Sequence, residues 1–255
     1  MSEYNYKAVN RDMGRAIHDY GMINPDDRIL VAVSGGKDSL TLLWMLSERL
    51  LRIPISYELY AVYVDPGFEG GFGPHLAEWC RRAGIELRVE ETDHGIFAHS
   101  SQNRENPCFM CARMRRKRIF EVAGQIGCSK IALGHHKDDI IETLFINMCY
   151  TGVMSTMRPA QDMFGGRFTM IRPLAYVDED RIRRFAADMG FPEFKTPCPS
   201  ADNSKRGEIK SIVNTMTRGK KKIKNNIFRS LSHVNMEYML KQEVRAKGPQ
   251  HPVKG

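Results

Sequence analysis

Hydrophobic and polar positions follow two different periods along the first 190 residues of the chain. Short runs of β-branched and aliphatic residues predict strands at residues 28–33, 59–65, 86–91 and 130–133. Longer runs, in which apolar residues recur every three or four positions, predict helices at residues 9–20, 40–51, 74–83, 110–126 and 140–150. Strands that alternate with helices in this way predict an α/β fold, with a doubly wound parallel sheet covered by helices on both faces.

The pattern changes in the last third of the chain. A short extended run at residues 168–172 precedes a helical pattern at residues 178–189, and three prolines then interrupt the chain before residue 200. Residues 205–229 contain nine Lys or Arg against one acid, and apolar residues recur there at helical spacing. We therefore expect a small, basic, helical C-terminal appendage after the α/β domain.

Composition and charge narrow the class of protein. The hydrophobic fraction of 42% and the charged fraction of 27% are typical of a soluble globular protein. No stretch approaches the roughly 18 consecutive apolar residues that a membrane helix needs, and the N-terminus lacks the apolar segment of a signal peptide. We therefore expect a cytoplasmic protein with no membrane partner. The net charge of +8 favours a polyanionic partner, and nucleic acid is the leading candidate.

A glycine-rich turn joins the first predicted strand to the helix after it, with the sequence Ser34-Gly35-Gly36-Lys37-Asp38-Ser39. Two glycines let the backbone approach an anion, the helix N-terminus directs N–H groups at it, and Lys37 adds a charge. A tight turn with an incidental helix cap is the alternative. Because Asp38 stands where a Walker A loop has Ser or Thr, the turn is of a different kind, and a Mg²⁺ ion is expected between Asp38 and bound phosphate.

The full string resembles the signature of the PP-loop ATPases, which split ATP into AMP and pyrophosphate. By that resemblance the six residues bind ATP, and Lys37 and Asp38 are candidate catalytic residues. Two other strands end at the same predicted edge of the sheet, where ligands bind in such folds. The candidate nucleotide contacts there are Val62, Val64, Gly134 and His135.

Two carboxylates follow the fourth predicted strand. Asp138 and Asp139 open the helix after it, facing the phosphate loop. They are candidates to hold Mg²⁺ or to take a proton from the substrate. The alternative is that they only complement the helix dipole.

Three of the six cysteines are candidate metal ligands. Cys108 and Cys111 form a Cys-x-x-Cys pair, and Cys198 lies between two prolines. Their spacing leaves three alternatives: zinc with His135 or His136 as a further ligand, a redox dithiol, or an iron–sulfur cluster with three protein thiolates. The other cysteines lie in apolar patterns, and we expect them to be buried; they are Cys80, Cys128 and Cys149.

Two groups of basic side chains are candidate RNA contacts. One group directly follows the cysteine pair, where five of the residues 113–118 are basic, and the other lies in the C-terminal appendage. For any single residue a solvated helix face is the alternative. Clusters in a basic protein favour a track for nucleic-acid phosphates. The candidates are Arg113, Arg115, Arg116, Lys220, Lys221 and Lys222.

The order of these motifs resembles that in TtcA-like proteins, the tRNA 2-thiocytidine synthetases. The resemblance rests on residues 34–39, 107–118, 134–148, 171–174 and 197–198. It implies an adenine-nucleotide α-hydrolase fold, a 4Fe-4S cluster bound by Cys108, Cys111 and Cys198, and thiolation of cytidine 32 of tRNA. Family members often have a second Cys-x-x-Cys around the third ligand, whereas Pro-Ser-Ala follows Cys198 here.

The resemblance also implies an order of reaction and a set of partners. Adenylation makes the C2 oxygen of cytosine a leaving group, and sulfide then replaces it. The implied cofactors are ATP, Mg²⁺ and the cluster, and the implied partners are tRNA and a sulfur donor such as a cysteine desulfurase. A homodimer is possible, and the sequence does not decide the oligomeric state. The alternatives are thiolation of another base such as uridine, or a non-catalytic zinc-containing module that binds nucleotide and RNA.

The motifs and patterns together divide the chain into four parts. Residues beyond 244 lack apolar periodicity and are predicted to be disordered. The expected parts are an N-terminal helix at residues 1–24, a PP-loop ATP-binding domain with the cysteine pair at 25–195, the third cysteine with a tRNA-binding appendage at 196–244, and a tail at 245–255.

Overall fold

The computed structural model describes residues 3–195, 197–200 and 205–240. The helices there are α1 (Glu3–Asp19), α2 (Lys37–Leu50), α3 (Gly73–Arg82), α4 (His94–Ala98), α5 (Pro107–Gln125), α6 (Lys137–Thr151), α7 (Glu179–Asp188), α8 (Lys205–Thr217) and α9 (Lys221–Ser230). The strands are β1 (Asp27–Ala32), β2 (Tyr57–Asp65), β3 (Leu87–Glu91), β4 (Lys130–Leu133), β5 (Ala160–Met163) and β6 (Phe168–Ile171). The predicted tail at residues 245–255 lies outside the described residues.

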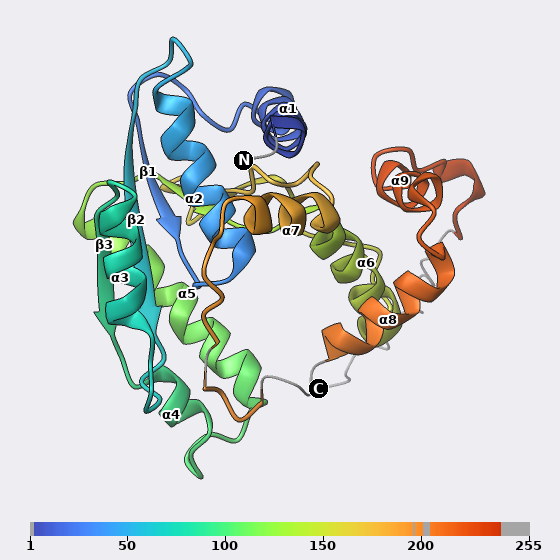
Figure 1. Ribbon diagram of the computed structural model, residues 1–255. Coiled ribbons are helices and arrows are strands. Elements are labelled where there is room, and N and C mark those ends of the chain that lie inside the picture. The colour runs from blue at the N-terminus through green and yellow to red at the C-terminus, as the bar shows by residue number, and fades with distance from the viewer. Residues whose placement is uncertain (1–2, 196, 201–204, 241–255) are drawn as a thin grey trace, which may run out of the picture.

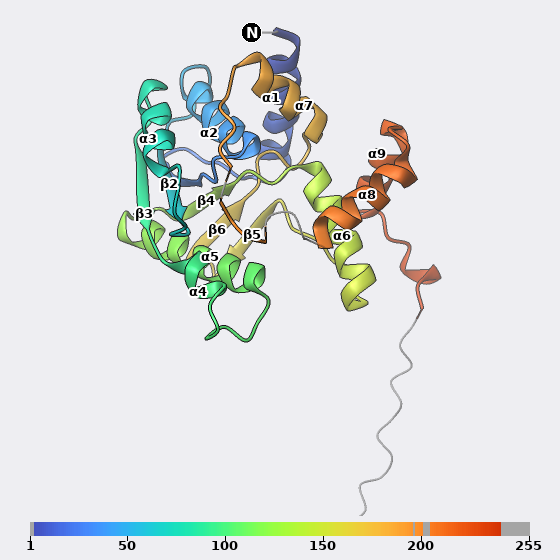
Figure 2. The ribbon, with the colours of Figure 1, turned by 60° about the horizontal axis from the view of Figure 1, so that its bottom comes forward.

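The strands form one sheet in the order β3-β2-β1-β4-β6-β5, shown in Figures 1 and 2. All neighbours pair in parallel except β5, which pairs antiparallel with β6. Ala32 at the end of β1 is in register with Val62 in β2 and with Leu133 in β4. The carboxyl ends of the three central strands therefore meet at one edge of the sheet.

Helices cover both faces of the sheet, as the alternation of elements predicts. Ile29 and Val31 of β1 point into a core formed with α1, α2, α3 and α7, whereas Leu30 points into a second core formed with α5. This follows from the two-residue period of a strand. Continuous apolar runs in the central strands are buried on both sides for the same reason. The doubly wound α/β prediction is confirmed.

The edge strand β5 was not predicted from the sequence. Its residues are Ala-Gln-Asp-Met, with no β-branched side chain, and none of them is fully buried. An edge strand pairs on one side only, so its sequence carries a weaker pattern than that of a central strand. It forms a hairpin with β6 and closes the side of the sheet opposite β3.

The outcome differs among the cysteines that were expected to be buried. Cys80 and Cys128 are buried in the two cores, as predicted. Cys149 is exposed, so that prediction is wrong. It lies in the last turn of α6 beside two other exposed residues, Met148 and Tyr150, where the helix extends away from the sheet (Figure 2).

The C-terminal segment returns to the sheet edge before the appendage begins. Phe194 stacks on Phe72, with ring centroids 5.0 Å apart, and this contact leads the chain back toward Cys198. The basic helices α8 and α9 then pack on α6 through Ile209, Val213 and Phe228. In the described ranges, no helix is long and apolar enough to span a membrane.

Candidate active site

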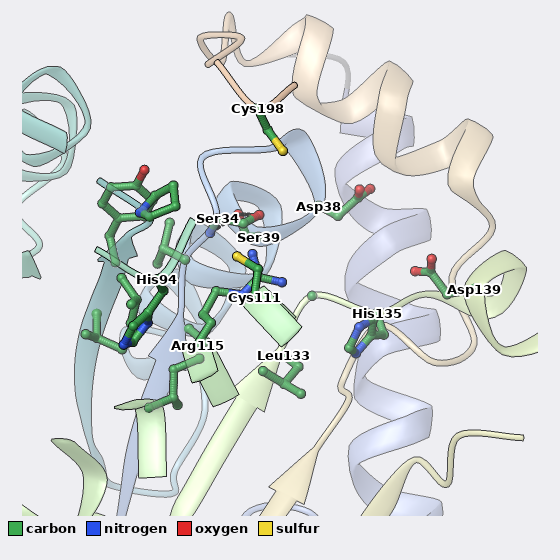
Figure 3. Close-up of a pocket in the computed structure, with 18 of the residues that line it drawn as sticks. Ser34, Asp38, Ser39, His94, Cys111, Arg115, Leu133, His135, Asp139 and Cys198 are labelled. Carbon is green, nitrogen blue, oxygen red and sulfur yellow. Dashed lines mark hydrogen bonds between the residues drawn. The ribbon is translucent and has the colours of Figure 1, made fainter. Parts of the chain in front are cut away.

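A cavity of about 440 Å³ opens at the carboxyl ends of β1, β2 and β4 (Figure 3). It is lined by the glycine-rich loop, the ends of three strands, one side of α5 and the segment that returns after α7. Residues from the predicted phosphate loop, the strand ends and the cysteine motifs meet there. Those that line it are Ser34, Asp38, Ser39, Val62, Val64, Cys111, Arg115, Gly134, His135, Asp139 and Cys198.

The glycine-rich loop is held by its own serines. The Ser34 backbone N–H donates to Ser39 Oγ at 3.1 Å, and Ser39 Oγ donates to the Gly36 carbonyl oxygen at 2.9 Å. Gly35 has a φ of +79°, and a Cβ there would lie 2.5 Å from the Phe72 ring. Glycine is therefore required at Gly35 for both conformation and space. The turn ends at the N-terminus of α2, the arrangement that favours anion binding.

Gly134 brings the end of β4 against that loop. A Cβ on Gly134 would lie 2.9 Å from the Ser39 backbone nitrogen and 3.0 Å from the Asp38 carbonyl carbon. Both atoms belong to the backbone at the start of α2, so they cannot move without distorting the helix. The absence of a side chain at Gly134 therefore lets the end of β4 pack closely against the start of α2.

Lys37 does not line the cavity; its side chain turns toward the start of α7. Its Nζ lies 3.1 Å from Asp38 Oδ2 and 3.2 Å from Glu179 Oε1. Burial opposes the charge of Lys37, but the two carboxylates raise its pKa above the ordinary value. Glu179 also accepts a hydrogen bond from Lys210 of α8 at 2.8 Å. The loop lysine and the appendage therefore share one carboxylate.

Glu179 was not among the candidates from the sequence. Burial works against its ionisation, yet the hydrogen bond from Lys210 and the charge of Lys37 lower the pKa of Glu179 to about 2. It is therefore ionised at neutral pH. In the sequence, Glu179 is simply an acidic residue at the start of a predicted helix. Acidic residues are common there because they complement the helix dipole, so its position does not mark it as a site residue.

Asp38 meets the requirements of a Mg²⁺ ligand. Within the described residues, its Oδ1 atom is buried and has no hydrogen-bond partner. Lys37 Nζ contacts the other oxygen of this carboxylate, and His136 Nε2 lies 3.7 Å from Oδ1. A buried carboxylate oxygen without a partner is rare, and Mg²⁺ prefers such oxygens. The donor set at this end of the cavity therefore fits the ion that the phosphate loop implies.

The two carboxylates at the start of α6 differ in position. Asp139 lines the cavity, caps its own helix by accepting from the His136 N–H at 3.0 Å, and accepts from Arg206 Nη1 at 2.7 Å. Asp138 points away from the cavity, accepts from the Glu179 N–H at 2.8 Å and pairs with Lys224 of α9. Both carboxylates fix the appendage to the domain, and only Asp139 faces the candidate ligand.

Glu142, one turn further along α6, is buried beside these groups. Burial, with the charge of Asp139, raises the pKa of Glu142 from 4.5 to about 7. The folded protein thus holds a proton on Glu142 that the unfolded chain releases at lower pH. Stability from this source is present below the unfolded pKa, falls as the pH rises from about 4.5 to 7, and is lost above that.

Replacing Glu142 with glutamine should therefore raise stability at pH 8 by about 1 to 3 kcal/mol and leave it nearly unchanged at pH 5. Urea denaturation at the two pH values measures the difference. Glu193→Gln, at an exposed carboxylate, is the control. An identical effect of Glu142→Gln at both pH values would contradict the assigned proton.

Arg172 is buried beside His135, which lines the cavity and is itself half-buried. The Arg172 Nε–H donates to His135 Nδ1 at 3.3 Å, and its guanidinium also donates to the Arg158 carbonyl oxygen. Burial lowers the pKa of Arg172 to about 10 and also lowers the pKa of His135, so the imidazole is neutral. In the part of the chain that is described, Arg172 has no carboxylate partner. Arg172 was missed as a site residue, although it ends the extended run predicted at residues 168–172.

The three candidate metal ligands approach one side of the cavity. Figure 3 shows the thiols of Cys111 and Cys198 at the same opening, and Cys108 lies one turn before Cys111 on α5. Burial raises the pKa of Cys111, and the neighbouring thiols of Cys198 and Cys108 add to that effect. Within the described ranges the three are not already drawn into a metal-binding geometry. Three soft donors converging at a helix N-terminus fit an iron–sulfur centre by their chemistry.

The basic candidates lie in two separate places. Arg115 lines the cavity, whereas Arg113 and Arg116 are exposed on another side of α5. The run at residues 220–222 is exposed at the start of α9, and among the described residues it makes no ion pair. Both groups are therefore accessible to a large anionic ligand.

If the run at residues 220–222 contacts the tRNA that the family resemblance implies, neutralising it with three glutamines should weaken tRNA binding and flatten its salt dependence. Each lost phosphate contact should reduce the log–log slope by about 0.7 to 0.9. ATP affinity should not change. A triple variant of Lys7, Arg81 and Arg82, which are exposed on other helices, controls for net charge. If both triple variants gave the same slope, the run would be an ordinary solvated surface.

The fold and the loop at its switch point define a nucleotide-binding protein of the PP-loop class. The family model described as the PP-loop domain matches residues 5–214. A tRNA-cytidine(32) 2-sulfurtransferase of Geobacter sulfurreducens is 38% identical, over 94% of this chain and 95% of the relative. One from Geotalea daltonii is 37% identical over 94% and 97%. The chain therefore belongs to the TtcA-like tRNA 2-thiocytidine synthetases of the PP-loop family.

Solved structures agree with this placement. The U34-tRNA thiolase NcsA from Methanococcus maripaludis, solved with its [4Fe-4S] cluster, matches with a TM-score of 0.74 and 25% identity, over 91% of this chain and 80% of that one. The NH₃-dependent NAD synthetase from Campylobacter jejuni shares the fold, with a TM-score of 0.52 and 13% identity over 90% and 92%. The same architecture therefore serves different chemistry, and the side chains of the site must decide the function.

Proposed function

We propose that this protein uses ATP to replace the C2 oxygen of cytidine 32 in tRNA with sulfur. The observation that carries the proposal is the shared cavity. The phosphate loop lines one side of it, and Cys111 and Cys198 line another. Activation of an oxygen and its replacement by sulfur must occur at the same carbon, so the two functional groups must open onto one space. The names of the relatives support tRNA as the substrate and cytidine as the base.

ATP is proposed to bind along the edge of the sheet. Residues 34–39 would hold the pyrophosphate portion, and the backbone of residues 62–64 with the Leu133 side chain would form the adenine wall. Asp38 would hold Mg²⁺ through its unpaired oxygen, and Lys37 would turn from Glu179 toward the phosphates. Bringing a fixed cation to the departing pyrophosphate stabilises the charge that develops there.

The cytosine oxygen would attack the α-phosphorus, so that an O–P bond forms and the bond to pyrophosphate breaks. Asp139 faces the cavity and is placed to take a proton from the base as its oxygen is adenylated. The neutral His135, oriented by Arg172, would contact the base. Arg115 would balance the negative charge of the adenylate. In the next step a C–S bond forms at C2 and the C–O bond breaks, so the oxygen leaves with AMP.

Cys108, Cys111 and Cys198 are proposed to hold a 4Fe-4S cluster, which would supply a bound sulfide for that step. The sulfur itself must come from a donor such as a cysteine desulfurase. NcsA was solved with its [4Fe-4S] cluster, and the Cys111 and Cys198 thiols at one cavity, with Cys108 one turn before Cys111 on α5, support the cluster here. A cluster held there would supply sulfur at the opening of the cavity that the base is proposed to enter.

Mass spectrometry of tRNA nucleosides from a deletion strain tests the proposal. We expect 2-thiocytidine to disappear and to return when the gene is restored. Loss of a 2-thiouridine instead would assign the protein to uridine. An unchanged set of thionucleosides would contradict a thiolase of either kind and favour a binding module.

A further inference from the structure

A second hollow lies outside the active-site cavity, between α5 and the β5–β6 hairpin. Its volume is about 740 Å³ and its floor is aromatic, with Phe120, Phe164 and Phe168. Its rim is basic, with Arg113, Arg116, Lys117 and Arg167, and Glu121 is the acid in its lining. The reaction proposed above uses none of these side chains. We call this hollow the hairpin groove.

Helix α5 connects the groove with the active site. Cys111, Arg115 and Ile119 are spaced four residues apart and line the cavity. Arg113, Arg116 and Phe120 are spaced three or four apart and line the groove. Residues with these spacings lie on common faces of a helix, so the two sites occupy two faces of one helix. A chain that crosses α5 can therefore reach both.

Phe164 presents an aromatic surface at the tip of the hairpin. Its side chain is 66% exposed, and it touches Phe120 edge-on, with ring centroids 4.9 Å apart and an interplanar angle of 85°. Phe164 also has a φ of +52°, a conformation that costs a bulky residue free energy. A polar residue or glycine would suit a solvated turn better. An exposed aromatic ring in a strained turn indicates a ligand-binding surface.

The charges around the groove favour a polyanion. In the described ranges, Arg116 and Arg167 make no ion pair, and the contact of Arg113 with Glu105 is 3.4 Å long. The Arg167 guanidinium lies over the Phe168 ring, 5.3 Å from its centroid. Unpaired arginines next to an exposed aromatic ring are the combination that holds single-stranded nucleic acid, by phosphate contacts and base stacking.

We propose that the hairpin groove binds an unpaired nucleotide of the substrate tRNA, close to the cytidine that enters the active site. The base would stack on Phe164, and Arg116 and Arg167 would contact the flanking phosphates. This inference rests on the proposed function, because it takes tRNA as the substrate. An apolar groove for a protein partner is the competing occupant, and the unpaired cations disfavour it.

The test compares tRNA affinity of Phe164→Ala, Phe164→Trp and the double variant Arg116→Gln/Arg167→Gln with that of the parent protein. Loss of the ring should weaken tRNA binding about 5- to 100-fold, the range for one stacked base, and tryptophan should restore it. The double variant should weaken binding and reduce the salt slope by roughly 1.4 to 1.8 log–log units. ATP affinity should stay unchanged in all three. Leu51→Ala, which removes an 82% exposed side chain elsewhere, is the matched control.

Photocrosslinking decides the identity of the occupant. With Phe164→p-benzoylphenylalanine we expect a crosslink to the tRNA loop that carries the target cytidine. A crosslink to protein instead, or unchanged tRNA affinity in the Phe164→Ala variant, would overturn the groove proposal while the parent protein still thiolates tRNA. A parent protein that neither binds nor thiolates tRNA would overturn the proposed function first, and the groove proposal with it.

Discussion

Lys37→Ala and Asp38→Ala are each expected to lower tRNA-dependent release of pyrophosphate by about 100-fold or more. In the proposed mechanism Lys37 supplies the cation for the departing phosphates, and Asp38 carries a buried oxygen that has no partner among the described residues and fits Mg²⁺. Loss of one preorganised electrostatic contact in a dry site has effects of this order. Pyrophosphate release and single-turnover adenylation, measured at saturating ATP, give the size of the effect.

Lys210→Ala is the matched control for the lysine. Lys210 shares Glu179 with Lys37 but belongs to α8 and does not line the cavity. Its removal leaves Lys37 to neutralise Glu179, so pyrophosphate release should fall far less than in Lys37→Ala. Near-normal turnover in both loop variants would overturn the assignment of residues 34–39 to ATP.

Replacement of Cys108, Cys111 or Cys198 by alanine is expected to abolish thiolation while ATP binding persists. The three thiols are proposed to hold one cluster, so the loss of any one removes a third of its protein ligands. The phosphate loop is fixed by its own serines and by Phe72, not by the cysteines. A zinc site that only supports the fold would instead lose stability and ATP affinity together.

Each cysteine variant is to be reconstituted anaerobically and assayed for iron, sulfide, ATP affinity and thionucleoside formation. Cys149→Ala, which removes an exposed thiol in the last turn of α6, is the control and should keep full activity. A Cys198→Ala protein with full iron content and normal thiolation would disprove the three-cysteine model.

Local patterns predicted the parts of the molecule that depend on neighbours in sequence. The glycine-rich loop directly follows the strand predicted at residues 28–33. Its position at the carboxyl end of that strand could therefore be predicted from the sequence. The alternation of short β-branched and aliphatic runs with longer amphipathic runs was enough to predict a doubly wound sheet. The family resemblance then favoured a 4Fe-4S cluster among the alternatives that the spacing of the three cysteines left open.

What the sequence did not predict depends on contacts between distant residues. Lys224 pairs with Asp138 across 86 positions, and Glu179 meets Lys37 across 142. No local pattern shows that Asp138 is paired with the appendage while Asp139 faces the cavity. Arg172 likewise looks like any basic residue after a strand until its burial beside His135 is known.

The central claim is that one cavity joins ATP chemistry to sulfur insertion at a tRNA base. Its most direct test is a reaction of the anaerobically reconstituted protein with ATP, Mg²⁺, sulfide and unmodified tRNA. The amounts of AMP, pyrophosphate and thionucleoside formed are to be measured. We expect one AMP, one pyrophosphate and one 2-thiocytidine for each tRNA modified, and none of them from tRNA in which uridine replaces cytidine 32. Formation of ADP, or release of AMP without any thionucleoside, would contradict the account.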